Sequence, residues 1–301
     1  MDTAAAALLP ALLARAGLPS RPEYELVRQV FPFSGVWRLR FPQRGGATVI
    51  YKHARAPLDR EHVALAYAAS QGIPVPHIIA ALQASGRAGI LMTDLGQPAR
   101  PATDADAAPL AAGIHSAPGN GLPPLDAAAL AEMPGRIAAK ADRHGLSEVT
   151  ARTAALIARS APQLAAPAIV QPIGLCHSEW HPDSVLIDAD GRPHVYDWAR
   201  AFSGPGLIDL ASWHGTRDAP DLTATRALIT AYVEAGGHRA ALADRAGLPA
   251  EAWALGWHRL WAANWYVRQL DMGWIPSLYL NEQREAIERH TAEAAALLRP
   301  P

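Results

Sequence analysis

The segment HSEWHPDSVLIDADGRPHVYDW, which runs from His177 to Trp198, concentrates side chains that could carry chemistry. His177 and His181 lie four positions apart around Glu179, an arrangement that invites comparison with zinc sites. Zinc proteases, however, place H-E-x-x-H on one continuous helix, and Pro182 disfavours that helix. Zinc deaminases begin with H-x-E but then require P-C-x-x-C, which a chain with one cysteine cannot supply. The segment therefore does not predict a zinc enzyme.

A second candidate pair lies in the N-terminal third of the chain. Lys52 falls in the β-rich run ATVIYKHA, and Glu61 follows nine positions later in a stretch of helix composition. A carboxylate on a helix beside a strand can hold a lysine ammonium in place. Considered alone, the two residues are more simply a surface lysine and a solvated helix glutamate. The order of the other motifs along the chain decides between these interpretations.

The elements that would position this pair form a small antiparallel sheet with a helix. Residues 36–41, VWRLRF, alternate apolar and basic side chains, as a half-buried strand does. The run 47–54 follows after the turn PQRGG, which predicts an antiparallel hairpin. Residues 59–72 have helix composition, with Asp59 placed to cap the start. Residues 89–96, GILMTDLG, read as a strand that ends in a polar connection.

The chain beyond this point is expected to be mainly helical. Alanine-rich helical segments such as DAAPLAAGIHSAPG and MPGRIAAKADRHGL are broken by proline and glycine. Strands return at VLID and HVYD, which flank Ala189-Asp190-Gly191 and predict a hairpin. The patterns together predict an α+β fold with a small N-terminal lobe, residues 1–96, and a larger helical lobe, residues 97–301.

Composition excludes several classes of partner. The formal net charge of −1 over 301 residues gives no general attraction to nucleic acid or anionic lipid. One cysteine, Cys176, excludes an internal disulfide and suits a reducing compartment. No run of eighteen apolar residues is present, and the N-terminal AAAALLPALLA is too short to span a membrane. We therefore expect a cytoplasmic protein with no nucleic-acid and no membrane partner.

The order of the motifs resembles the aminoglycoside phosphotransferase family, relatives of protein kinases that phosphorylate small molecules. The resemblance implies a bilobal protein-kinase-like fold and transfer of the γ-phosphoryl group of ATP or GTP to a hydroxyl, with Mg²⁺ as cofactor. It extends from about residue 27 to residue 215 and is carried by Lys52 in VIYKHA, Glu61 in DREHV, IPVPHII, ILMTDLG, His115 in LAAGIHS, HSEWHPDSVLI, VYDW and GPGLIDLASW.

The resemblance implies a nucleotide site in the N-terminal lobe. Lys52, held by Glu61, would grip the α and β phosphates. The adenine would lie against the connection after Met92, bonded by backbone near Asp94 and Leu95. The phosphate loop, VFPFSGVW, contains one glycine, Gly35, where protein kinases carry three in G-x-G-x-x-G, so the loop is uninformative by itself.

The catalytic loop departs from the family pattern, H-G-D-x-x-x-x-N. His177 matches, but Ser178 replaces the glycine, Glu179 stands at the position of the catalytic base, and Ser184 replaces the asparagine that holds magnesium. Asp197 matches the metal-binding aspartate that follows the next strand. Glu179 keeps the charge on a longer arm, and a misplacement of about 1 Å can cost roughly a hundredfold in rate. An active kinase and a nucleotide-binding protein with lost catalysis both fit this loop.

Two residues of the same region are expected to be structural. His177 braces the catalytic loop in the family resembled, and Asp209, in GLIDLA, resembles a buried aspartate that ties the backbone of that loop.

The acceptor remains open between a small molecule, such as an antibiotic or natural product, and a serine or threonine of a precursor peptide. Trp253, Trp257, Trp261 and Trp265 recur at intervals of four, and each step overshoots a helical turn by about 40°. The ends of this row therefore point about 120° apart, so the four cannot enter one core equally. Such tryptophans are usually core residues, but some could line a pocket for a ring-bearing, partly apolar acceptor.

Overall fold

The computed structural model describes residues 3–30 and 34–299, and the chain divides into two compact units. The first unit joins Met1–Ala102 to Asp183–Arg200, and the second joins Thr103–Pro182 to Ala201–Pro301. Each unit is therefore built from two separate stretches of the chain. The split predicted between residues 96 and 97 stays a prediction.

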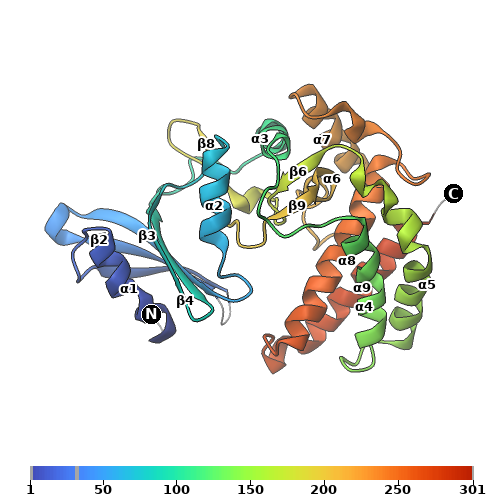
Figure 1. Cartoon of the computed structure of the whole chain (residues 1–301), viewed down its shortest axis with the longest axis horizontal. Helices are drawn as coiled ribbons and strands as arrows, with labels where there is room; N and C mark the ends of the chain where they lie inside the picture. The colour runs from blue at the N-terminus through green and yellow to red at the C-terminus, as the bar shows by residue number, and fades with distance from the viewer. Residues whose placement is uncertain (1–2, 31–33, 300–301) are drawn as a thin grey trace. The chain divides into compact units, whose positions relative to one another are not determined.

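The first unit is a five-stranded antiparallel sheet with two helices (Figure 1). The strand order is β1-β2-β3-β5-β4, and a two-stranded hairpin, β7-β8, belongs to the same unit. The elements are α1 (Thr3–Arg15), β1 (Glu23–Val30), β2 (Ser34–Phe41), η1 (Pro42–Arg44), β3 (Ala47–Arg55), α2 (Glu61–Ser70), β4 (Ile78–Ala84), β5 (Arg87–Thr93), β7 (Val185–Ile187) and β8 (Pro193–Val195).

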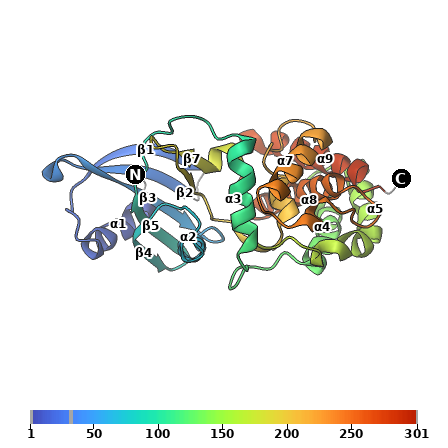
Figure 2. The same cartoon turned by 90° about the horizontal axis from the view of Figure 1, so that it is seen from above.

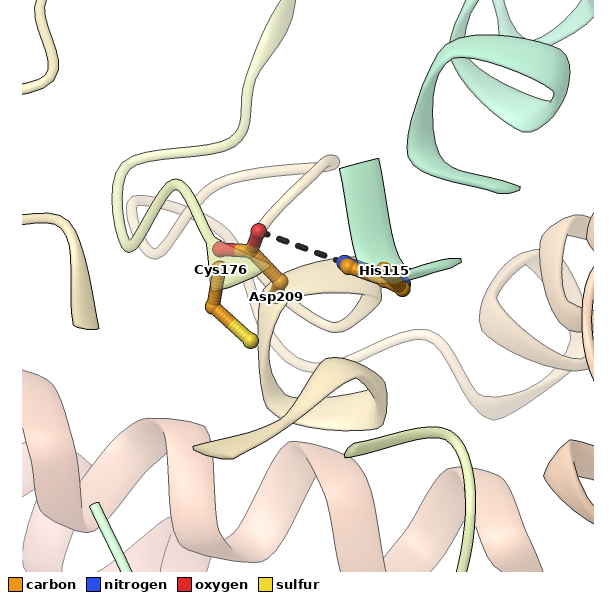
Figure 3. Close-up of side chains that lie close together, drawn as sticks. All are labelled: His115, Cys176 and Asp209. Carbon is orange, nitrogen blue, oxygen red and sulfur yellow. Dashed lines mark hydrogen bonds and ion pairs between the residues drawn. The ribbon is translucent and has the colours of Figure 1, made fainter. Parts of the chain in front are cut away.

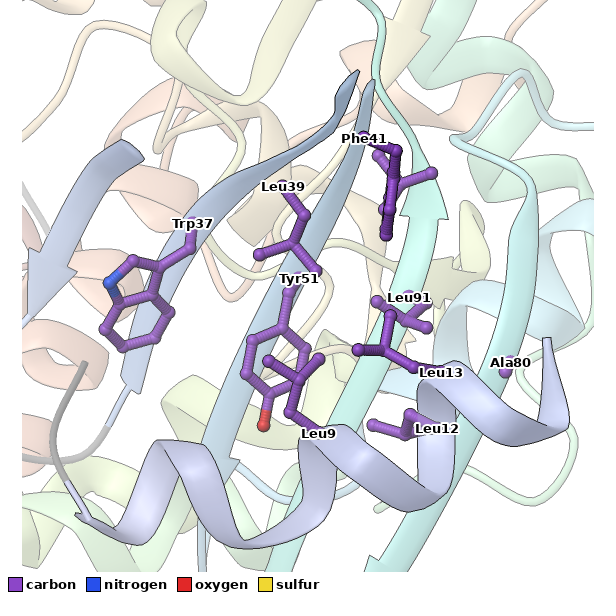
Figure 4. Close-up of a cluster of buried hydrophobic side chains, with 10 residues drawn as sticks. Leu9, Leu12, Leu13, Trp37, Leu39, Phe41, Tyr51, Ala80 and Leu91 are labelled. Atoms are coloured by element: carbon purple, nitrogen blue, oxygen red, sulfur yellow. The ribbon is translucent and has the colours of Figure 1, made fainter. Parts of the chain in front are cut away.

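One face of this sheet is covered by α1 (Figure 4). The alternation predicted for residues 36–41 is confirmed, because Trp37, Leu39 and Phe41 of β2 are all buried on that face. Leu9 and Leu12 of α1 lie three positions apart, so both point down onto the strands. Val36 and Arg38 of β2 alternate with these residues and lie on the other face of the sheet.

The start of α2 differs from the prediction. Asp59 does not cap the helix, since the N-cap residue is Arg60 and makes no side-chain cap hydrogen bond. The carboxylate of Asp59 instead accepts a hydrogen bond from Gln83 Nε2 of β4 at 2.9 Å. Asp59 therefore ties the connection before α2 to the edge strand of the sheet.

The second unit is mainly helical, and α4, α5, α8 and α9 lie together within it (Figures 1 and 2). Its elements are α3 (Asp104–Ser116), α4 (Ala127–Lys140), α5 (Glu148–Ala165), η2 (Ala166–Ile169), β6 (Ile173–Cys176), β9 (Phe202–Pro205), α6 (Gly206–Leu210), α7 (Leu222–Glu234), η4 (Arg239–Leu242), α8 (Ala250–Asp271), η5 (Ser277–Tyr279) and α9 (Leu280–Leu297), with η3 (Pro182–Ser184) at the junction. The predicted α+β class is therefore confirmed.

Polar caps fix where several of these helices begin. Asp126, Ser147 and Asp221 each accept a hydrogen bond from a backbone N–H of the first turn of α4, α5 and α7, respectively. Such caps satisfy donors that have no partner inside the helix. The alanine-rich segments therefore start at defined residues although their composition alone leaves the boundaries open.

The tryptophan row of α8 drifts around the helix as predicted. Trp253 and Trp257 are fully buried, and Trp253 Nε1 donates to the carbonyl of Leu164 at 2.7 Å. Trp261 and Trp265, one and two turns later, are only partly buried. The first half of the row is therefore core, whereas the second half reaches the surface of the second unit.

Among the described residues, no helix has both the length and the apolar character needed to cross a bilayer.

Candidate active site

A cavity of about 290 Å³ lies on the face of the sheet that α1 leaves uncovered. Val36, Ile50 and Met92 supply apolar walls from β2, β3 and β5. They share this face because Val36 and Ile50 alternate with the buried core residues of their strands, and Ile50 pairs directly with Met92. All residues that line the cavity belong to the first unit. The cavity can therefore be described without reference to the second unit.

Three charged groups meet at one end of this cavity. Lys52 Nζ lies 2.7 Å from Glu61 Oε2 and 2.5 Å from Asp197 Oδ1. The side chains of Lys52 and Glu61 are only 9% and 3% exposed, whereas that of Asp197 is 32% exposed. Burial lowers the pKa of Lys52, but the two carboxylates outweigh it and raise that pKa overall. The lysine is therefore a permanent cation at this position.

The three charges do not balance, which makes the cluster receptive to a further cation. Two carboxylates share one ammonium, and burial raises the pKa of Glu61 more than Lys52 lowers it. The more exposed carboxylate, Asp197, is the one able to contact a bound ion. Carboxylate oxygens supplemented by phosphate oxygens are the usual ligands of Mg²⁺. The donor chemistry of Asp197 therefore fits a magnesium site.

The backbone places Asp197 by means of the β7-β8 hairpin. Val185 pairs with Val195, and the N–H of Tyr196 donates to the carbonyl of Ser184 at 3.0 Å. The N–H of Val195 donates to the carbonyl of Pro74 at 2.7 Å, which ties the hairpin to the connection after α2. Asp197 itself has φ +69°, a left-handed backbone conformation that is unfavourable for residues other than glycine. The fold thus holds this carboxylate in an unfavourable backbone geometry next to Lys52.

An ion pair at the connection after β5 also lines the cavity. Arg38 Nε lies 2.6 Å from Asp94 Oδ2, and the N–H of Gly96 donates to Asp94 Oδ1 at 3.0 Å. Burial raises the pKa of Asp94, but the hydrogen bond and charge of Arg38, together with hydrogen bonds from Gly96 and Thr48, outweigh burial and hold that pKa below its usual value. The connection containing Asp94 and Leu95 is thereby anchored to β2, with its backbone along the cavity.

The second unit contains the loop with Glu179. The backbone N–H groups of His177 and Ser178 donate to the two carboxylate oxygens of Asp209, each at 2.6 Å. Asp209 is 1% exposed, so the loop is held from inside the unit. The predicted role of Asp209 as a tie to this loop is confirmed. Glu179 itself is partly buried on the same loop.

Asp209 also lies beside His115 and Cys176, the one group of potential metal ligands found among the described residues (Figure 3). His115 Nε2 is 3.4 Å from Asp209 Oδ2. Both oxygens of Asp209 already accept backbone hydrogen bonds, from His177 and Ser178. Burial, followed by the charge of Asp209, raises the pKa of Cys176 well above its ordinary value, so the sulfur stays a neutral thiol. Because both oxygens of Asp209 are engaged by backbone donors of the loop, this cluster acts as a structural brace.

Comparison with known proteins decides which of the chemical interpretations applies. Residues 34–250, more than two thirds of the chain, match the family described as "Phosphotransferase enzyme family". The chain belongs to that phosphotransferase family. The predicted family and the predicted enzyme class are therefore confirmed. No curated protein sequence matches the chain at a significant level.

Solved structures resemble the phosphotransferase over nearly its whole length. A protein assigned as an aminoglycoside phosphotransferase from Ralstonia eutropha JMP134 has a TM-score of 0.63 at 15% identity, covering 99% of this chain and 98% of that one. A macrolide 2'-phosphotransferase from Brachybacterium faecium has a TM-score of 0.57 at 21% identity, covering 97% and 98%. A spectinomycin phosphotransferase solved with ADP and spectinomycin has a TM-score of 0.56 at 12% identity, covering 91% and 92%. These similarities confirm the kinase-like fold.

The phosphotransferase brings together most of the residues predicted for nucleotide binding. The cavity lining includes Lys52, Glu61, Met92, Asp94, Leu95 and Asp197. Ser184 is not in the lining and is 1% exposed, although its carbonyl accepts a hydrogen bond from Tyr196, the residue before Asp197. Glu179 belongs to the second unit and is not in the lining either.

Gly35 is placed differently from the expectation for a phosphate loop. It is absent from the cavity lining, and it alternates with Val36 so that it faces the α1 side of the sheet. A Cβ atom at this position would come within 2.2 Å of the Trp37 ring. Packing against Trp37 therefore accounts for the glycine. Residues 31–33 of the same predicted loop lie outside the described residues.

Several residues of the phosphotransferase cavity were not anticipated from the sequence. β1 was not predicted, so Val27 and Arg28 were missed, and Arg38 was predicted only as one of the basic residues of a half-buried strand. Tyr196 also lines the cavity, and burial raises its pKa, with Arg28 acting in the opposite direction. The one available signal was the run EYELVRQV, which lacks a clean alternation because it contains a bulge.

Proposed function

We propose that this phosphotransferase transfers the γ-phosphoryl group of ATP or GTP to a hydroxyl of a small molecule, with Mg²⁺ as cofactor. The observation that carries the proposal is the buried Lys52, held between Glu61 and Asp197 in the lining of a cavity of about 290 Å³. A lysine fixed in this way is a rigid phosphate clamp, because its rotamer freedom is lost before the ligand arrives. Phosphoryl transfer depends mainly on such positioning and charge neutralisation.

The nucleotide base is proposed to lie at the opposite end of the cavity from Lys52. Met92 and Ile50 offer apolar surface to the ring, and the backbone near Asp94 and Leu95 offers hydrogen-bonding groups. The Arg38–Asp94 ion pair supports this assignment because it keeps the connection in place. The α and β phosphates would then contact Lys52.

Asp197 is proposed as the principal Mg²⁺ ligand, and Ser184 as a secondary ligand. The exposed carboxylate of Asp197 supports the first assignment. The position of Ser184 beside Tyr196 on the hairpin supports the second, although its side chain is buried. A bound Mg²⁺ would neutralise charge on the transferring phosphates. Because Ser184 stands in place of the asparagine of the family pattern, Asp197 would contribute more to Mg²⁺ binding than the matching aspartate does beside an asparagine.

Glu179 is proposed as the catalytic base. The acceptor oxygen forms a bond to the γ-phosphorus, the bond to the bridging oxygen of the β-phosphate breaks, and the nucleoside diphosphate leaves. Glu179 takes the proton of the acceptor hydroxyl. Glu179 lies on the loop that is held by Asp209, which supports this role. The hydrogen bonds to Asp209 fix the backbone of His177 and Ser178, the two residues before Glu179.

The acceptor is proposed to carry a ring with apolar surface. Trp261 and Trp265 on α8 are partly exposed, and Trp265 packs edge-on against Trp274 with ring centroids 5.9 Å apart. Flat indoles offer stacking surface to ring systems. One structural relative is named as a macrolide phosphotransferase and another was solved with spectinomycin, which supports testing antibiotics of both kinds.

The test is consumption of ATP and GTP with Mg²⁺ against a panel of macrolides, aminoglycosides, nucleoside antibiotics and serine-containing peptides. We expect one ring-bearing small molecule to gain the mass of a phosphate. Glu179→Gln should abolish turnover and leave nucleotide binding intact, whereas the exposed control Glu234→Gln should change neither. Phosphorylation of a peptide alone would contradict the small-molecule proposal. Nucleotide binding without turnover on any acceptor would instead indicate a protein that has lost catalysis.

A further inference from the structure

Arg28 lies on the cavity side of the first unit because of an irregularity in β1. Glu25 pairs with Arg38 and Leu26 pairs with Trp37, but the next pair is Arg28 with Val36. The strand therefore contains one extra residue, Val27, which has no partner in the ladder. A bulge of this kind redirects the side chains that follow it. Without the bulge, Val27 would oppose Val36 and Arg28 would move to the opposite face of the sheet.

The register also places Arg28 level with the phosphate clamp. Arg28 opposes Val36 of β2, and Val36 opposes Lys52 of β3, so the three residues form one cross-strand row. Side chains in such a row point to the same face, and strands are about 4.8 Å apart, so the backbones of Arg28 and Lys52 are separated by roughly 10 Å. Only the short Val36 side chain lies between them. The base end of the cavity belongs to a different row, which contains Arg38 and Ile50.

The charges of the lining single out Arg28. Three basic side chains line the cavity: Arg28, Arg38 and Lys52. Arg38 is matched by Asp94 and Lys52 by Glu61 and Asp197. Within residues 3–30 and 34–299, Arg28 makes no ion pair with a carboxylate, and it is exposed. It is the cation of the lining that can take a new anionic partner without losing an existing one.

We infer that Arg28 is a second phosphate-binding residue. It contacts the β or γ phosphate from the β1 end of the cross-strand row, whereas Lys52 lies at the β3 end. This inference rests on the proposed nucleotide site. An arginine guanidinium binds phosphate oxygens through two parallel N–H donors, which a lysine cannot reproduce. Arg28 thereby supplies positive charge in a protein whose predicted phosphate loop, VFPFSGVW, contains the single glycine Gly35.

The test measures dissociation constants for adenosine, AMP, ADP and ATP with Mg²⁺, and for the guanosine series in parallel. Arg28→Gln should bind ATP roughly tenfold more weakly than the wild type and leave nucleoside binding unchanged, because one charge-assisted contact is lost. Arg28→Lys should recover part of the loss. Arg40→Gln is the matched control, since Arg40 is an exposed arginine of β2 outside the cavity lining.

The outcomes separate this inference from the proposed function. If the wild type binds ATP with Mg²⁺ but Arg28→Gln matches it for every ligand, the inference is wrong and the nucleotide site stands. A loss that is equal for adenosine and ATP would also overturn it, because the defect would then be general rather than tied to phosphate. If the wild type binds no member of either series, both the inference and the nucleotide site are wrong.

Discussion

Replacing Ser178 by glycine should stabilise the protein, because the backbone of Ser178 is left-handed and its buried hydroxyl has no hydrogen-bond partner among the described residues. The residue has φ +78°, within the left-handed region where a non-glycine residue costs about 1–2 kcal/mol. Glycine at this position would avoid that cost but lose about 0.5–1 kcal/mol through the greater freedom of the unfolded chain. The backbone contribution of Ser178→Gly is therefore a net gain of up to about 1.5 kcal/mol.

The hydroxyl of Ser178 adds a second contribution. Its Oγ atom is buried and finds no hydrogen-bond partner among the described residues. Leaving a buried polar group unsatisfied costs about 1–3 kcal/mol, and Ser178→Gly removes that group. The backbone N–H that donates to Asp209 is unchanged by the substitution. We expect a total stabilisation of about 1–4.5 kcal/mol, and each kcal/mol raises the Tm of a domain of this size by roughly 2–4 °C.

Thermal unfolding followed by tryptophan fluorescence measures this effect, because Trp180 lies two residues away and packs on Trp213 with ring centroids 5.3 Å apart. Ser178→Ala is the control that separates the two contributions. It removes the hydroxyl but keeps the Cβ atom, so its Tm should fall between those of the wild type and Ser178→Gly. A glycine variant less stable than the wild type would refute the reasoning. An alanine variant equal to the glycine variant would show that backbone strain contributes nothing.

Three further predictions concern stability. Gly35→Ala should destabilise the first unit by about 1–3 kcal/mol in urea unfolding, since the Cβ would meet Trp37; weaker nucleotide binding without loss of stability would instead favour a role in ligand contact. Asp209→Asn should cost about 3 kcal/mol and suppress turnover, because an amide nitrogen would face a backbone donor; an unchanged Tm would contradict the tie. His290 is buried, and burial together with Arg259 and Arg289 lowers its pKa to about 3 from 6.5. The unfolded chain binds this proton at higher pH, so stability should fall by up to about 4 kcal/mol as pH drops from 6.5 to 3, and His290→Gln should flatten that slope.

Much of the fold follows from local patterns in the sequence. The alternation in residues 36–41, the hairpin around Ala189–Gly191 and the drift of the tryptophan row each depend on periodicity within one element, and each is found in the structure. The family assignment followed from the order of short motifs, which is a property of the sequence itself.

The missed features depend on contacts that no local pattern encodes. β1 was missed because its bulge breaks the alternation, and the cavity role of Arg28 depends on that same bulge. The cap assigned to Asp59 failed because Gln83, from a distant strand, binds its carboxylate. Pairing between strands and a contact from a distant strand decided these two. The assignment of Gly35 to a phosphate loop stays a prediction, to which the structure adds that Trp37 occupies the space where a side chain would lie.

If Lys52 and Asp197 form a phosphate and magnesium site, calorimetric titration with ATP will detect it. Lys52 retains Glu61 as a partner when Asp197 is replaced, so Asp197→Asn should fold normally. We predict that the wild type binds ATP more tightly with Mg²⁺ than without it, that Asp197→Asn loses this difference, and that Lys52→Met binds ATP weakly under both conditions. Equal binding with and without Mg²⁺ in the wild type, or unchanged binding in both variants, would contradict the account.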